Sequence, residues 1–169
     1  NRTRMAKVAI VEVGTFHDEC LYSQLLFFAN SEKETFLICN EKIKERVKDF
    51  PADHILFLDF SEKKSKYKNW FKIRRFILDQ KISKVIFNTA ESNIFKLILL
   101  PFGRRTELIG IIHNTQKLKK KFKNKLIAKR LDKILVLSEF IEENVKKEKI
   151  TSKKIAHFYP IFFPKANII

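Results

Sequence analysis

The segment Leu108-Ile-Gly-Ile-Ile112 is an apolar, strand-like run that ends in His113-Asn114. A second run, Lys133-Ile-Leu-Val-Leu137, ends in Ser138-Glu139. Both runs therefore place polar side chains directly after a buried strand. In an open sheet of parallel strands, ligands bind outside the carboxyl ends of the strands, where the strand-to-helix loops meet. The two motifs together predict one site at one edge of a parallel sheet.

Short apolar runs alternate with helical patterns along the rest of the chain. The expected strands cover residues 8–13, 35–39, 55–60, 85–87, 108–112 and 134–137, with 155–163 as a candidate seventh. The expected helices are the segment carrying Leu21, Leu25, Leu26 and Phe28 and residues 41–49, 67–80, 92–100, 116–130 and 139–147. Near-continuous apolar strands separated by helices indicate a parallel sheet covered on both faces. We predict an α/β, Rossmann-like, doubly wound fold with a mostly parallel sheet of six to seven strands.

The composition fits one domain covering residues 1–169, because 45% of the side chains are hydrophobic and the chain is too short for two ordinary domains. With 3 glycines and 4 prolines and no Ser/Gly-rich stretch, no linker is expected. Cys20 and Cys39 do not form a CxxC pair, and the 4 histidines lack zinc-ligand spacing. We expect a reduced, cytoplasmic protein without a structural metal.

No segment of the sequence resembles a membrane span or a secretory signal. The longest apolar segment, residues 94–102, contains Lys96 and is shorter than the ~20 residues that a spanning helix needs. We therefore expect a chain that does not cross a membrane.

The chain is strongly basic, with 35 Lys and Arg against 19 Asp and Glu and a net charge of +16. The resulting positive field attracts phosphate-rich partners: nucleic acid, anionic lipid or nucleotide-linked substrates. The positions of the charges must decide among these three classes.

Three segments of the chain resemble a known family. They are Ile111-Ile-His-Asn-Thr115, residues 131–141 (Leu-Asp-Lys-Ile-Leu-Val-Leu-Ser-Glu-Phe-Ile) and residues 154–160 (Lys-Ile-Ala-His-Phe-Tyr-Pro). Together they resemble the N-terminal domain of GT-B glycosyltransferases of group 1, the glycogen-synthase-like or family 4 type. That family has a strand ending in His, then a strand of the form D-x-(apolar)-S, then a strand leading toward the interdomain linker. The resemblance implies half an enzyme, because the family's donor-binding C-terminal domain has no counterpart after Ile169.

The resemblance also assigns roles to residues. It makes His113 the candidate catalytic residue, beside the transferred sugar. It places these residues in the cleft between acceptor and donor: Gly14, Thr15, His17, Asn88, Thr89, Asn114, Ser138 and Glu139. The acid-base partner stays open among Glu12, Asp18, Glu91 and Glu139.

Several of these residues also have a purely structural interpretation. Ser138 fits the N-cap of a helix with early glutamates, and His113 fits a hydrogen-bonded surface histidine. The family often has two or more glycines after its first strand, whereas Gly14 is followed here by Thr15-Phe16-His17. This departure argues against close contact between that loop and a donor phosphate.

Two basic stretches form the candidate surface for an anionic membrane. In residues 117–130, apolar side chains at 118, 122, 126 and 127 are expected to seat a helix on the sheet and leave a cationic outer face. The lysines assigned to this membrane-facing surface are Lys117, Lys119, Lys120, Lys121, Lys123 and Lys125. In residues 63–75, lysines and arginines alternate with Tyr67, Trp70 and Phe71, a mixture that suits a headgroup region. A solvated basic face, and core packing of Trp70 and Phe71 with Ile77, are the alternatives.

We therefore expect the acceptor-binding domain of a glycosyltransferase that transfers a sugar from a nucleotide-sugar donor to a glycan or lipid-linked acceptor. The resemblance suggests bacterial surface polysaccharide synthesis, peripheral membrane association, no cofactor in this domain, and no activity without the missing C-terminal domain.

Two other classes compete with the glycosyltransferase. A basic nucleic-acid-binding α/β protein fits the charge, but no helix-turn-helix, zinc-finger, RNP or KH signature is present. Lysine also outnumbers arginine, the residue that favours base reading, so no specific nucleic acid is expected. A nucleotide-binding regulator would need a P-loop, a GxGxxG motif or an acidic cluster, and the sequence has none of these.

Overall fold

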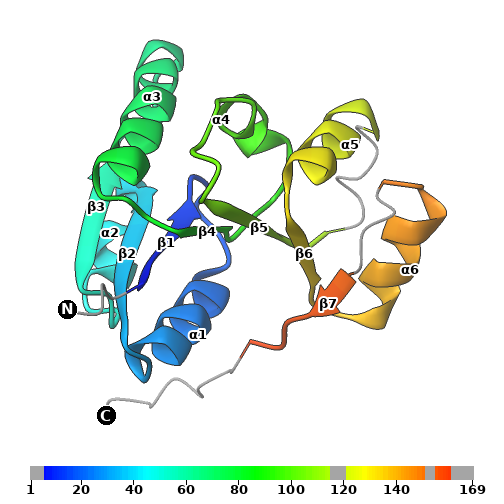
Figure 1. The fold of residues 1–169 in the computed structure, drawn as a ribbon, viewed down its shortest axis with the longest axis horizontal. Coiled ribbons are helices and arrows are strands. Elements are labelled where there is room, and N and C mark those ends of the chain that lie inside the picture. Colours follow the sequence, from blue (N-terminus) through cyan, green and yellow to red (C-terminus); the bar gives the residue numbers. More distant parts are fainter. Residues whose placement is uncertain (1–5, 115–120, 151–154, 161–169) are drawn as a thin grey trace.

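The computed structural model describes residues 6–114, 121–150 and 155–160 (Figure 1). Its strands are β1 (Ala6–Glu12), β2 (Lys33–Asn40), β3 (His54–Leu58), β4 (Lys84–Phe87), β5 (Glu107–Ile112), β6 (Lys133–Val136) and β7 (Ile155–His157). Its helices are α1 (Asp18–Ala29), α2 (Lys44–Val47), α3 (Lys63–Asp79), α4 (Phe95–Ile98), α5 (Lys121–Arg130) and α6 (Glu139–Lys147). Two 3-10 turns, η1 (Glu41–Ile43) and η2 (Ser92–Ile94), precede α2 and α4.

The seven strands form one sheet in the order β3-β2-β1-β4-β5-β6-β7, and every neighbouring pair is parallel. Strands β2 and β3 therefore follow one another on one side of β1, and β4 to β7 follow one another on the other side of β1. The predicted α/β, doubly wound fold is confirmed. The strand order reverses between β1 and β4, and this switch point is where open α/β sheets bind ligands.

Each strand is apolar on both sides because helices cover both faces of the sheet. In β1, Val8 and Ile10 pack against the buried side chains of α1, whereas Ala9 and Val11 belong to the core of the opposite face. Figure 1 shows α3, α4 and α5 above the sheet and α1 below it. The alternation in β1 therefore buries the strand almost completely.

Several element boundaries differ from the sequence prediction. Helix α3 begins at Lys63 rather than at Tyr67. The segments predicted as helices at 41–49 and 92–100 each consist of a 3-10 turn and one short α-helical turn. Strand β7 ends at His157, and residues 158–160 are not strand. The N-terminal part of the helix predicted at 116–130 lies outside the described residues.

The buried face of α5 differs from the predicted apolar stripe. Asn124, Ile127 and Ala128 are buried, whereas Phe122 is 74% exposed. The prediction that Phe122 seats this helix on the sheet is therefore wrong, because the helix is rotated so that a polar residue faces the core. Leu126 is half-buried, and Leu118 lies outside the described residues.

Candidate functional site

The candidate site lies at the carboxyl edge of the sheet, where the loops after β1, β4 and β5 meet. The loop after β1 carries Gly14, Thr15 and His17, and the loop after β4 begins with Asn88-Thr89. His113 follows β5, which is hydrogen-bonded to β4. Because β1, β4 and β5 are adjacent in the sheet, these three loops converge at the switch point.

A buried carboxylate joins the first two of these loops. Glu12, the last residue of β1, is 1% exposed. Its Oε1 accepts a 2.7 Å hydrogen bond from the Gly14 backbone N–H, and its Oε2 accepts bonds from Asn88 Nδ2 (2.7 Å) and Thr89 Oγ1 (2.6 Å). Burial raises the pKa of Glu12 from its ordinary value of 4.5, and the bonds from Thr89, Asn88 and Gly14 oppose that rise. Glu12 therefore holds the two loops together.

The position of Glu12 also determines whether the backbone N–H of Gly14 can bind a ligand and whether a side chain fits at Gly14. The Gly14 N–H points at the Glu12 carboxylate, so it is not available to a ligand phosphate. A Cβ at Gly14 would lie 2.8 Å from Glu12 Oε1, which explains the glycine without any ligand. The single glycine after β1 thus serves the fold.

Asn88 is fully buried and connects α1 to the same network. Its Oδ1 accepts a 2.7 Å bond from Gln24 Nε2 of α1, and its Nδ2 also lies 3.3 Å from the His17 carbonyl oxygen. Gln24 is itself 4% exposed. The loop after β4 is therefore fixed by side chains from β1 and α1 and by a backbone carbonyl of the loop between them.

His113 contacts this network through its ring. Its Nε2 donates a hydrogen bond to the Asn88 carbonyl oxygen, and its Nδ1 lies 4.0 Å from the Cys20 sulfur. Because a carbonyl only accepts, this geometry places the neutral ring's proton on Nε2. The ring of His17 stacks on that of His113, with centroids 3.8 Å apart and planes 13° from parallel. The two histidines therefore form one aromatic pair over the start of α1.

The loop after β1 is held from its other side by Arg46. Its Nη2 donates to the Thr15 carbonyl oxygen at 2.6 Å, and its Nε lies 3.1 Å from Asp18 Oδ2. His17 has a φ of 68°, in the left-handed region, so the chain turns sharply as it enters α1. Phe16, at the tip of this loop, is 70% exposed.

The site offers polar contacts rather than a strong nucleophile. Burial raises the pKa of the Cys20 thiol to about 12, so the thiol stays protonated near neutral pH. Within the described residues, no group of three or more His, Cys, Asp or Glu side chains could hold a metal ion. The buried amide, hydroxyl and carboxylate groups of Asn88, Thr89 and Glu12 bond to one another, so the two histidine rings are the polar groups of this network that lie nearer to a ligand.

The other predicted cleft residues are arranged differently. Asn114 follows His113 and is half-buried. Ser138 accepts a hydrogen bond from the Ile141 N–H and is the N-cap of α6, as the structural interpretation predicted. Glu139 is exposed in the first turn of that helix. Both residues follow β6, on the far side of β5 from the Glu12 network.

The basic and aromatic surface is only partly described. Lys117, Lys119 and Lys120 and the side chain of Lys121 lie outside the described part of the chain. Lys123 and Lys125 are exposed, and Phe71 is 60% exposed. Trp70 is 7% exposed and packs against Phe60, with ring centroids 5.3 Å apart. Trp70 is therefore a core residue, and its expected place on an exposed membrane face is wrong.

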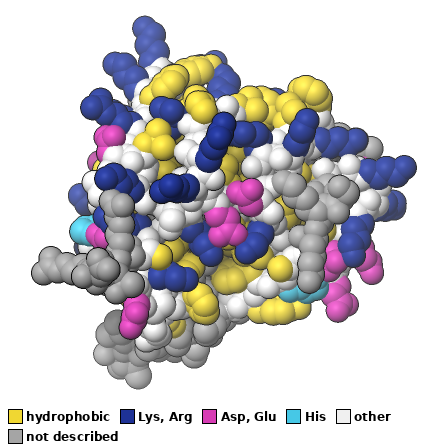
Figure 2. Space-filling view, viewed as in Figure 1, with side chains coloured by type: hydrophobic (Ala, Val, Ile, Leu, Met, Phe, Trp, Pro, Cys, Tyr) yellow, Lys and Arg dark blue, Asp and Glu magenta, His cyan; other side chains and the backbone are white. Residues whose placement is uncertain are grey.

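The charge is spread widely rather than gathered in one place. Figure 2 shows Lys and Arg side chains over the top, the middle and both sides of the face in view, with acidic side chains in a few small groups. No helix among the described residues is long and apolar enough to span a membrane.

The sequence did not assign the roles of Glu12, Gln24 and Arg46. Glu12 was one of four open acid-base candidates, and its position inside the run Val-Ala-Ile-Val-Glu-Val was a usable signal, because a carboxylate in a buried strand needs partners. Gln24 and Arg46 lie in helices whose orientation the sequence does not determine. Neither residue carried a comparable signal.

No protein-family model matches the sequence, and no curated protein matches it. Solved structures do share the fold. A UDP-GlcNAc 2-epimerase from Methanocaldococcus jannaschii is 13% identical with a TM-score of 0.63, over 90% of this chain and 45% of that one. Another UDP-N-acetylglucosamine 2-epimerase is 12% identical with a TM-score of 0.64, over 90% and 46%.

The lipopolysaccharide outer core galactosyltransferase WaaB is 17% identical with a TM-score of 0.60, over 90% of this chain and 45% of that one. The chain thus spans less than half the length of these proteins. It shares its fold with about half the length of these two epimerases and of this galactosyltransferase.

Proposed function

We propose that this chain is the acceptor-side half of a glycosyltransferase that uses a nucleotide-sugar donor. The main support is one observation. His113, with His17 stacked on its ring and Asn88 bonded to it, lies at the switch point of a half domain whose fold recurs in nucleotide-sugar enzymes. A second, donor-binding domain of the same polypeptide would close over this edge. The acceptor is a glycan or a lipid-linked sugar.

His113 is the residue that would lie nearest the reacting sugar. The Asn88 carbonyl oxygen accepts a hydrogen bond from His113 Nε2 and so fixes the His113 ring, and His17 covers one face of that ring. Glu12, Asn88 and Thr89 are positioning residues, because their polar atoms are committed to each other beneath the loops. His17 is half-buried and stacks on His113, and we expect it to rotate when a sugar enters.

The test is sugar transfer by the polypeptide that joins this chain to a donor-binding domain. Release of nucleoside diphosphate is measured for a panel of nucleotide-sugars, with and without a glycolipid extract as acceptor. We expect His113→Ala to reduce acceptor-dependent release by about a hundredfold or more. His54→Ala is the matched control, since His54 lies on β3 and pairs with Glu34 away from the site. Equal activity of both variants would refute the role of His113.

A nucleotide-sugar epimerase is the second candidate. Its support is the fold shared with two UDP-N-acetylglucosamine 2-epimerases, at TM-scores of 0.63 and 0.64. A 2-epimerase changes the configuration at C2 of the sugar and needs no acceptor. Product analysis after incubation with UDP-N-acetylglucosamine alone therefore separates the two functions.

We also propose that the domain meets its acceptor at an anionic membrane surface. The support is a net charge of +16 together with exposed Phe71, Phe122 and lysines of α5. Co-sedimentation with phosphatidylglycerol vesicles, but not with phosphatidylcholine vesicles, should decrease as salt increases. It should be lost when Lys119, Lys121 and Lys125 are changed to Glu. Binding to generic DNA that is lost in the same variant, without vesicle binding, would favour the nucleic-acid alternative.

A further inference from the structure

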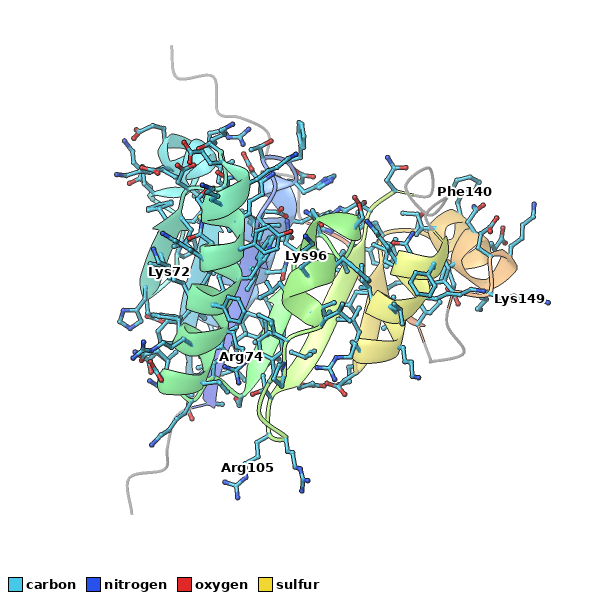
Figure 3. All side chains as sticks on the ribbon, turned by 90° about the horizontal axis from the view of Figure 1, so that it is seen from above. Lys72, Arg74, Lys96, Arg105, Phe140 and Lys149 are labelled. Carbon is cyan, nitrogen blue, oxygen red and sulfur yellow. The ribbon has the colours of Figure 1, made fainter. Side chains whose placement is uncertain are left out.

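A groove of about 410 Å³ lies between α3, the η2–α4 segment and α5. It is lined by Lys63, Lys66, Tyr67, Trp70, Ser92, Asn93, Phe95, Lys96 and Lys123. Figure 3 shows Lys96 between α3 and α4. One end of the groove adjoins the loop after β1, because Asn93 Nδ2 lies 3.8 Å from the position of a Cβ on Gly14.

The lining of the groove carries four positive charges and no carboxylate. Lys63 and Lys66 come from the first turn of α3, Lys96 from α4 and Lys123 from α5. Within the described part of the chain, none of these four ammonium groups forms an ion pair with an acidic side chain. Other lysines on this protein are paired, as Lys84 and Lys133 are with Glu107. Four like charges around one cavity repel each other unless an anion is bound.

Aromatic side chains hold two of the lysines in place. The Lys96 ammonium lies 4.1 Å from the Tyr67 ring centroid and donates a hydrogen bond to the Tyr67 hydroxyl. The Lys123 ammonium lies 5.5 Å from the Phe95 ring centroid. The bond from Lys96 and the charges of Lys96 and Lys63 lower the pKa of Tyr67. Both lysines are therefore positioned by cation–π contacts, and each keeps further N–H donors for a ligand.

We propose that this groove binds a phosphate-bearing ligand, with the phosphate among the four lysines and the organic part against Tyr67 and Phe95. A phosphate group carries up to two negative charges and accepts hydrogen bonds from several directions, which matches donors that converge from three helices. The volume suits one phosphorylated sugar or one headgroup rather than a polymer. The inference does not depend on the proposed sugar transfer, because the groove is on the α3–α4–α5 face and its ligand need not react.

Trp70 is the only tryptophan of the chain and lines the groove, so its fluorescence reports binding directly. The full chain is titrated with inorganic pyrophosphate and, separately, with phosphatidylglycerol vesicles. We expect a saturable change in fluorescence that Lys63→Gln/Lys66→Gln weakens about tenfold, since two charge-assisted contacts are lost. The matched control is Lys68→Gln/Lys72→Gln, which removes the same charge from the same helix. Neither control residue lines the groove, and Figure 3 shows Lys72 on the side of α3 away from α4.

The outcomes distinguish a soluble phosphorylated ligand from a phospholipid headgroup, and both from general nucleic-acid binding. Binding of pyrophosphate that only the groove variant weakens supports a soluble phosphorylated ligand. The same pattern with vesicles alone supports a phospholipid headgroup. Equal weakening in the groove and control variants, or no response to either probe, overturns the proposal. Saturable binding of a single-stranded oligonucleotide that both variants weaken alike would replace it with general nucleic-acid binding.

Discussion

At the scale of single residues, Glu12 is the residue on which the candidate site depends most. It is a carboxylate at the end of a buried strand, and its three hydrogen bonds come from two different loops. Burial raises its pKa, which makes the charged form less favourable in the folded protein than in the unfolded chain. The same residue that orders the site therefore makes the stability of the protein dependent on pH.

This dependence can be measured with Glu12→Gln, which does not titrate. Below the ordinary pKa of 4.5, Glu12 is protonated in both states and its burial costs little. As the pH rises above 4.5, the unfolded chain releases the Glu12 proton while the folded protein still holds it. The free energy of unfolding therefore decreases until the pH has passed the higher pKa of the folded state. We expect the wild type to lose stability relative to Glu12→Gln as the pH rises above the ordinary pKa of 4.5, measured by urea unfolding. A stability difference that stays constant, or moves the other way, would contradict the raised pKa.

At the scale of elements, Gly110 determines how closely β5 and its neighbours pack. A Cβ on Gly110 would lie 2.5 Å from the Ala90 Cβ and 2.6 Å from Leu131 Cδ1. Ala90 belongs to the loop after β4, and Leu131 follows α5. The missing side chain at Gly110 therefore lets a site loop and a helix end rest directly on the strand.

We expect Gly110→Ala to lower the free energy of unfolding by about 1–3 kcal/mol, because the added methyl group overpacks the core. Gly103→Ala is the control, since its nearest neighbour, Leu78 Cδ2, would be 3.7 Å away and the position is exposed. Urea unfolding of both variants against the wild type measures the difference. If Gly103→Ala were as destabilising as Gly110→Ala, close packing at β5 would not be the cause.

The N-terminus of α6 provides a second prediction at this scale. The Ser138 hydroxyl accepts a bond from the Ile141 N–H, so Ser138→Ala should destabilise the protein by about 1 kcal/mol. Ser138→Asp should retain most of the stability, because its carboxylate also accepts this bond and favours the helix dipole. Denaturant midpoints of the two variants give the comparison. If Ser138→Ala and Ser138→Asp were equally destabilising, the hydrogen bond from the Ile141 N–H would not be the reason that Ser138 stabilises the protein.

The strands could be predicted because burial on both faces makes them nearly continuous apolar runs, as in Val8 to Val13, which Glu12 alone interrupts. The rotation of the helices could not. Trp70 and Phe71 are adjacent in sequence, yet one is 7% and the other 60% exposed. Only the packing of α3 against its neighbours decides which ring turns inward. In α5, an apolar stripe through Phe122 missed the buried Asn124 for the same reason.

The candidate site was predicted to a similar extent. His113, Asn88 and Thr89 follow neighbouring strands, so their meeting at one edge follows from the order of the elements. The stacking of His17 on His113 depends on the left-handed backbone conformation of His17, which the sequence around this residue does not predict. The bond between Arg46 and the Thr15 carbonyl joins segments 31 residues apart and likewise depends on tertiary packing.

At the scale of the whole molecule, the net charge of +16 opposes folding. Bringing 35 basic side chains onto one compact surface increases their mutual repulsion. Surface ion pairs such as Lys7–Glu34 and Lys146–Glu142 offset part of it, but surface pairs contribute only about 0–1 kcal/mol each. Repulsion distributed over the surface should therefore exceed the attraction within individual pairs.

Added salt should consequently stabilise this protein. Raising sodium chloride from about 0.01 M to about 0.15 M shortens the Debye length from about 30 Å to about 8 Å, which screens long-range repulsion more than close pairs. We expect the midpoint of thermal unfolding, followed by circular dichroism, to rise by about 2–4 °C for each kcal/mol of repulsion removed. Lys63→Gln/Lys66→Gln should show a similar rise, because the effect belongs to the whole charge distribution and not to one groove. A midpoint that falls with salt would mean that the ion pairs outweigh the repulsion.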